Sequence, residues 1–174
     1  MEPKNKDLSV LIDNGDWKKA RALINKRLRK EPENHWLLTR LSLTFYEERK
    51  YDKALEVALK GYKIKPRCPL VLWDLAGAYD MVGKEKEAIK NWKKIIKKGE
   101  ERIAYNECGE GLVWARSLIN DSLYRIGLSY NDLGKYSLAI YYIQKHIMNR
   151  KSIKSIYNLR TVKKKLEMIK EKLR

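Results

Sequence analysis

Side chains that commonly do chemistry are scarce in this sequence. It contains two histidines, His35 and His146, and two cysteines, Cys68 and Cys108. A thiol beside an imidazole can act as a nucleophile, but nothing in the pattern orients Cys108 towards either histidine. The cysteines lack metal-ligand spacing, and we expect free thiols in a reducing cytoplasm. We therefore predict that the chain is not an enzyme and has no metal site and no cofactor.

Two closely spaced glycines are a feature of phosphate-binding loops. Gly109 and Gly111 flank Glu110. This stretch follows a helical pattern rather than a strand, and it lacks the lysine and the serine or threonine that a phosphate loop uses. We predict a simple turn.

The elements that carry these residues repeat along the chain. Ala20, Ala54, Ala88 and Ala139 lie in similar local patterns at spacings of 34, 34 and 51 residues. A period of 34 is typical of helix pairs that stack into a solenoid. Small residues at such positions allow two helices to cross closely. The sequence therefore predicts an all-α solenoid with one insertion.

The repeats also share other landmarks, which resemble the tetratricopeptide repeat family. In the second repeat they are Leu38, Leu41, Ser42, Phe45, Tyr51, Ala54, Ala58 and Pro66. In the fourth they are Leu123, Ile126, Gly127, Tyr130, Gly134, Tyr136 and Ala139. Two positions depart from the family pattern: Arg49 replaces the turn glycine of the second repeat, and Glu85 replaces an aromatic residue in the third.

The resemblance implies one domain over residues 1–174, a right-handed solenoid of about four helix pairs. We place the repeats at residues 1–34, 35–68, 69–102 and 120–153, with an insertion at 103–119 and a capping helix at 154–174. The first helix should run from about Lys4 to Asn14.

The insertion is half a repeat long, so it cannot form another helix pair. Its apolar spacing predicts that the first helix of the fourth repeat begins near Gly111, while the helix before it continues through Ile103. These lengthened helices would form a hairpin joined by residues 106–110. Tyr105 and Trp114 either close this hairpin or form a lip beside a binding groove.

The C-terminal stretch is predicted to be an amphipathic cap. It has neither glycine nor proline from residue 154 onwards, and Val162, Leu166, Ile169 and Leu173 form one apolar stripe. Terminal repeats of solenoids need such a cap with a polar outer face. The polar face carries Lys163, Lys164, Lys165, Lys170 and Lys172.

The predicted function follows from the concave side, which the first helix of each repeat lines. Tryptophan, tyrosine and arginine often anchor protein interfaces, although an aromatic residue here can instead pack between repeats. We predict a scaffold that binds a peptide or helix of a partner protein. The candidate groove residues are Trp36, Arg40, Leu43, Tyr46, Trp73, Asp74, Tyr124, Arg125, Leu128 and Asn131.

One branch of the family holds the acidic tail of a chaperone between lysine, asparagine and arginine side chains. The matching positions here carry Asn5, Ser9, Arg40, Leu70 and Asp74. Asp74 would repel a carboxylate where that branch has a cation. We therefore predict that the chain does not bind a chaperone tail in this way.

Net charge supports an alternative function. The formal charge is +17, and residues 145–174 contain only two acids, Glu167 and Glu171. Such a surface attracts nucleic acid, and the alternative is weak RNA binding through the basic C-terminal helix and outer face. A lysine-rich composition can equally reflect an AT-rich genome. The start is too polar for a secretory signal and no stretch is long enough to span a membrane, so we expect a cytoplasmic protein.

Overall fold

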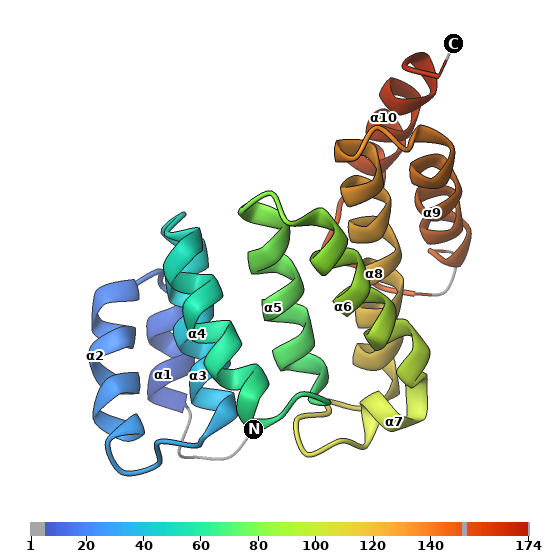
Figure 1. Cartoon of the computed structure of the whole chain (residues 1–174). Coiled ribbons are helices and arrows are strands. Elements are labelled where there is room, and N and C mark those ends of the chain that lie inside the picture. The colour runs from blue at the N-terminus through green and yellow to red at the C-terminus, as the bar shows by residue number, and fades with distance from the viewer. Residues whose placement is uncertain (1–5, 151–152, 174) are drawn as a thin grey trace. The chain divides into compact units, whose positions relative to one another are not determined.

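The computed structural model describes residues 6–150 and 153–173, and all regular secondary structure in these ranges is helical (Figure 1). The first five residues, with Lys4 and Asn5 among them, lie outside the described ranges. The described helices are α1 (Lys6–Asp13), α2 (Trp17–Leu28), α3 (His35–Glu47), α4 (Tyr51–Ile64), α5 (Pro69–Met81), α6 (Glu85–Lys98), α7 (Glu100–Ala104), α8 (Leu112–Asp132), α9 (Tyr136–Asn149) and α10 (Leu159–Glu171).

The tight turns within the helix pairs share a left-handed backbone conformation. Gly15, Gly83 and Gly134 have φ angles of 71°, 72° and 68°, a left-handed conformation that suits glycine. Arg49, which replaces the turn glycine of the second repeat, adopts the same conformation with φ 58°. The turn therefore keeps its geometry at the cost of some backbone strain in the arginine.

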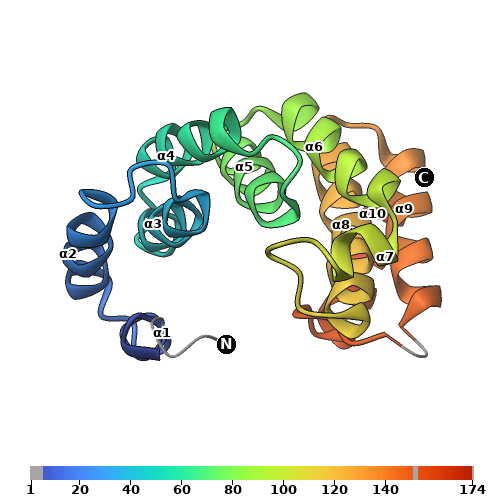
Figure 2. The ribbon, with the colours of Figure 1, turned by 90° about the horizontal axis from the view of Figure 1, so that it is seen from below.

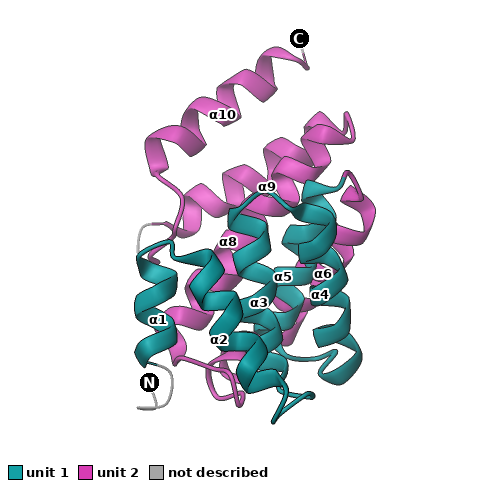
Figure 3. Cartoon of the chain, turned by 90° about the vertical axis from the view of Figure 1, so that its left-hand side faces the viewer, with its two compact units in different colours: residues 1–82 teal, residues 83–174 magenta. Residues whose placement is uncertain are grey.

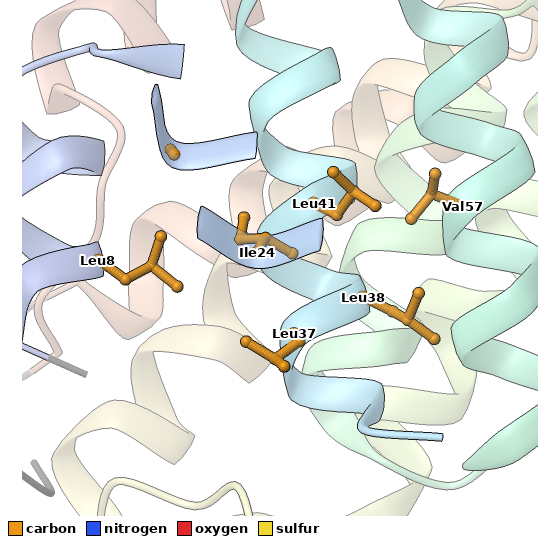
Figure 4. Packing of buried hydrophobic residues seen from close by; sticks show 7 residues of the cluster. Leu8, Ile24, Leu37, Leu38, Leu41 and Val57 are labelled. Carbon is orange, nitrogen blue, oxygen red and sulfur yellow. The ribbon is translucent and has the colours of Figure 1, made fainter. Parts of the chain in front are cut away.

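The chain forms two compact units, residues 1–82 and 83–174 (Figure 3). In unit 1, α1, α3 and α5 lie in one layer and α2 and α4 lie in the other (Figure 2). Leu8, Ile24 and Leu37 are among the buried residues of its core (Figure 4). Ala20 and Ala54 have no exposed surface, in agreement with the close crossings predicted for them.

Unit 2 is built around α8, which packs against α6, α7 and α9. Ala88 and Ala139 are fully buried here. Gly127 marks the closest approach of α8 and α9, because an added Cβ would lie 2.6 Å from Ile143 Cγ1 and 3.1 Å from the carbonyl oxygen of Ala139. No helix in the described ranges is both long and apolar enough to cross a membrane.

The insertion agrees with the prediction at one end and differs at the other. Helix α8 begins directly after Gly111, as predicted. Helix α6 does not continue through Ile103, because Gly99 adopts a φ of 81° and starts the separate five-residue helix α7. The loop then folds back on α7, where the N–H of Gly111 donates to the carbonyl of Ala104.

The predicted cap from residue 154 is also shorter than expected. Residues 153–158 are not helical, and α10 begins at Leu159 because the Asn158 side chain accepts hydrogen bonds from the backbone N–H groups of Arg160 and Thr161. The predicted apolar stripe is buried at Val162, Leu166 and Ile169. Leu173 lies beyond the helix and is 54 % exposed.

Candidate functional site: the α3–α5 face

The predicted groove residues of unit 1 come from two neighbouring first helices of the repeats. Helices α3 and α5 lie in the same layer (Figure 2). We call the set on these helices the α3–α5 face. It comprises Trp36, Arg40, Leu43, Tyr46, Trp73 and Asp74, each of which is partly exposed.

Trp36 and Arg40 form a preorganised pair on one side of α3. The Arg40 guanidinium lies over the Trp36 ring at 5.6 Å from its centroid, as expected for residues one turn apart. Arg40 Nε also lies 3.4 Å from the hydroxyl of Thr39, which itself donates to the Trp36 carbonyl. Trp36 additionally packs against the core of unit 1, so only part of its ring is available to a partner.

Asp74 introduces a buried acceptor beside this pair. Its Oδ2 atom is shielded from solvent and has no hydrogen-bond partner among the described residues. Burial raises the pKa of Asp74 to about 7, although the positive charge of Arg40 acts in the opposite direction. The carboxyl group is therefore divided between its two protonation states near neutrality, where it can either donate or accept a hydrogen bond.

Tyr46 is engaged by contacts within unit 1. Its ring contacts Tyr51 of α4 edge-on, with the centroids 5.5 Å apart, and it packs against the buried cluster of Ala54 and Leu75. Leu43 and Trp73 remain partly exposed. The residues of this face that remain available to a partner are therefore Trp36, Arg40, Leu43, Trp73 and Asp74.

In unit 2 the predicted groove positions on α8 are largely covered. Tyr124 is only 6 % exposed, and its ring contacts Tyr157 at 4.7 Å and His146 at 5.3 Å between centroids. Asn131 is also 6 % exposed and accepts a hydrogen bond from Lys172. We predicted that both residues lie in an open groove. They are buried instead, because the C-terminal part of unit 2 packs over them.

The other two positions on α8 are also engaged within unit 2. Leu128 packs against the buried cluster that contains Val162 and Ile169 of α10. The Arg125 guanidinium lies 5.7 Å from the centroid of the buried Trp92 ring. Sequence periodicity assigned all four residues to the correct helix, but it carries no signal for what covers that helix.

The histidine of unit 2 has a structural role. His146 has no exposed surface, and its Nδ1 donates to the Asn120 carbonyl over 2.8 Å. Burial lowers the pKa of His146 and raises that of Asp121. Asp121 Oδ2 accepts the backbone N–H of Ile156 over 3.1 Å, which fastens residues 153–158 to α8. These two titratable side chains therefore tie helices together inside unit 2.

Comparison with known proteins agrees with this architecture. A family model described as tetratricopeptide repeat matches residues 121–145. The sequence has no match among functionally curated proteins. The chain thus carries a recognisable tetratricopeptide repeat in α8 and α9, which confirms the resemblance seen in the sequence.

Solved structures with similar folds match most of the chain. A crystal structure of MamA has a TM-score of 0.63 and 22 % identity, covering 87 % of this chain and 76 % of that one. MamA from Desulfovibrio magneticus RS-1 has a TM-score of 0.68 and 12 % identity, with coverage of 97 % and 88 %. The first repeat domain of Spaghetti (RPAP3), bound to an HSP90 peptide, has a TM-score of 0.58 and 19 % identity, covering 80 % and 92 %. The fold is a tetratricopeptide-repeat solenoid.

Proposed function

We propose that this protein is a non-enzymatic scaffold that binds an extended peptide or a helix of a partner protein on the α3–α5 face. Solenoids of this kind generally use the surface lined by their first helices for protein–protein interaction. The observation that carries the proposal is the partly exposed Trp36–Arg40 pair beside the buried acceptor of Asp74. Tryptophan and arginine are the residue types that most often anchor interfaces.

The chemistry of this face favours a partner segment with a hydrogen-bond donor. Arg40 occupies one side of the site, while Asp74 offers a shielded oxygen that no described group satisfies. A buried polar group without a partner is unfavourable, and a rotation of the Asp74 side chain towards a donor on a bound segment would relieve that cost. An apolar side chain of the same segment would pack on Leu43 and Trp73.

The same residues argue against an acidic chaperone tail as the partner. The structure of Spaghetti was determined with the HSP90 peptide SRMEEVD. In this chain Leu70 is 9 % exposed, and Asp74 stands where a cation would be needed. An ionised Asp74 would repel the carboxylates of such a peptide.

The compartment that we propose is the cytoplasm. Both cysteines are free thiols, as expected of a protein in a reducing environment.

Affinity purification from the native cell at high salt tests the proposal. We expect a salt-resistant protein partner with the wild-type chain, and its loss with the Arg40→Glu and Trp73→Ala variants. Lys60→Glu on α4 is the matched surface control, because Lys60 is exposed and its ion pair among the described residues is with Glu56 of the same helix. Thermal denaturation confirms that each variant is folded. Retention of the partner by folded Arg40→Glu and Trp73→Ala would contradict the proposal.

A further inference from the structure

Unit 2 carries a row of exposed lysines that the scaffold function does not use. Lys86, Lys90, Lys93 and Lys97 are all exposed and occur at intervals of 4, 3 and 4 residues along α6. At 3.6 residues per turn, this spacing places them on one helix face, and at 1.5 Å per residue the row extends over about 16 Å. Within the described chain, no carboxylate pairs with Lys86, Lys90 or Lys97.

The lysine row continues into a row of tyrosine rings. Lys93 Nζ donates to the Tyr130 hydroxyl over 3.0 Å and lies 5.5 Å and 5.9 Å from the ring centroids of Tyr130 and Tyr142. Tyr130 stacks on Tyr142 with centroids 5.5 Å apart, and Tyr141 contacts Tyr142 edge-on at 5.2 Å. Tyr141 is 54 % exposed, so part of its ring is open to a ligand.

Few negative charges interrupt this surface, which we call the α6–α9 face. Helix α9 contains neither aspartate nor glutamate, and its Lys145 is exposed one turn after Tyr141. On α6, Glu87 lies roughly 90° around the helix from the centre of the lysine row. The α6–α9 face consists of Lys86, Lys90, Lys93, Lys97, Tyr130, Tyr141, Tyr142 and Lys145.

The basic helix α10 is a weaker candidate for binding an anion. Lys170 pairs with Glu167 over 2.8 Å. Lys163 shares one side of the helix with Glu167, and Glu171 follows one turn later. Helix α6 also contains two glutamates, Glu85 and Glu87, but neither pairs with an exposed lysine of the row in the described chain, whereas Lys170 of α10 is paired.

We propose that the α6–α9 face binds single-stranded nucleic acid. The exposed lysines of α6 contact successive phosphates, and a base stacks on the open ring of Tyr141. Basic grooves lined with aromatic rings bind single strands in this manner, with little dependence on base sequence. A duplex is a poorer ligand because its bases are already stacked on each other.

Fluorescence anisotropy with labelled 15-nucleotide uridine and thymidine strands and a 15-base-pair duplex tests the proposal on the full chain. The surface binds phosphates and bases rather than the sugar, so both single strands should bind with similar affinity and more tightly than the duplex. Binding should weaken with salt, since lysine contacts release counterions from phosphates.

Two matched pairs of variants locate the site. Lys90→Glu with Lys97→Glu should weaken single-strand binding at least tenfold, whereas Lys163→Glu with Lys164→Glu, which changes the net charge equally, should weaken it less than threefold. Tyr141→Ala should cost roughly fivefold or more for single strands, as expected for a lost stacking contact. Tyr105→Ala, which removes a tyrosine that is 75 % exposed outside this face, should have no effect.

The proposal fails if the two double charge reversals weaken binding equally, if the duplex binds as well as the single strands, or if neither strand binds at low salt. Leu138 and Met148 are also exposed on α9, so an anionic membrane surface is the rival ligand. Vesicles containing phosphatidylserine should not compete with the labelled strand. Competition that Tyr141→Ala and Lys90→Glu with Lys97→Glu abolish would overturn the nucleic-acid assignment.

Discussion

The imidazole of His146 donates from Nδ1 to the backbone carbonyl of Asn120, and this bond ties α9 to α8 inside unit 2. The carbonyl oxygen can only accept, so Nδ1 carries the proton in the neutral ring. Nε2 is then unprotonated, buried and without a hydrogen-bond partner among the described residues. A second proton on this nitrogen would introduce a poorly solvated positive charge.

This arrangement predicts that acid destabilises unit 2 through His146. Burial lowers the pKa of His146 in the folded state below its ordinary value of 6.5. The unfolded state therefore binds the proton more readily, and stability that is present above about pH 6.5 is lost as the pH falls through the folded-state pKa. We expect the melting temperature to decrease between pH 7 and pH 5.

His146→Asn separates this effect from other titrating groups, because asparagine can retain a donor near Nδ1 but does not titrate. The acid-induced decrease in melting temperature should be smaller in this variant than in the wild type. Asp121, whose raised pKa acts in the opposite direction, is present in both proteins. His35→Asn, which makes the same substitution at the other histidine of the chain, is the matched control. An unchanged pH profile in His146→Asn would refute the prediction.

Asp74 should give the reverse pH dependence in unit 1. Its pKa is raised from 3.8 to about 7 by burial, so the folded state favours the neutral acid. The stability associated with that proton is present below the unfolded pKa and is lost as the pH rises through 7. Asp74→Asn should therefore raise the melting temperature above that of the wild type at pH 8, with a much smaller difference at pH 4. Equal differences at the two pH values would contradict the raised pKa.

The close approach of α8 and α9 predicts opposite effects of one substitution at two helical glycines. Gly127→Ala would place a methyl group 2.6 Å from Ile143 Cγ1, so we expect a loss of about 1–3 kcal/mol in the free energy of unfolding. Gly61→Ala places its methyl group 3.7 Å from the nearest atom and removes a flexible residue from a helix, so it should be neutral or stabilising. Chemical denaturation measures both, and equal effects would refute the packing argument.

Much of this architecture could be predicted from sequence because it depends on local spacing. The period of Ala20, Ala54, Ala88 and Ala139 reports close helix crossings, and all four residues are fully buried. The helical spacing that predicted one helix through Ile103 does not register Gly99, and a glycine within a helical pattern can either continue a helix or break it. Its φ of 81° breaks the helix between α6 and α7.

The remaining differences concern contacts between elements. The absence of glycine and proline after residue 153 favoured a continuous helix, but the side chain of Asn158 starts α10 at Leu159. The non-helical segment before it brings Tyr157 onto Tyr124. The periodicity of α8 identifies the side of the helix on which Tyr124 lies. Residues 153–158, which cover that side, are not part of a repeat, so the 34-residue period does not predict their position.

The role of α10 as a cap predicts a contrast between two neighbouring side chains. Ile169 is 1 % exposed within the unit 2 cluster, whereas Met168 is 48 % exposed. Ile169→Ala should lower the free energy of unfolding by about 2–5 kcal/mol, which is typical of a large-to-small change in a core. Met168→Ala should change it by less than about 0.5 kcal/mol. Equal stability of the two variants in chemical denaturation would mean that α10 does not cap the unit.

Site-specific photocrosslinking in the native cell tests whether a partner protein lies on the α3–α5 face, as we propose. A photoreactive phenylalanine analogue at position 73 is compared with the same analogue at the exposed position 60 on α4. We predict one dominant crosslinked partner from position 73 that persists in high salt and disappears with Arg40→Glu. Crosslinking of the same partner from position 60 but not from position 73 would show that the partner binds elsewhere on the protein.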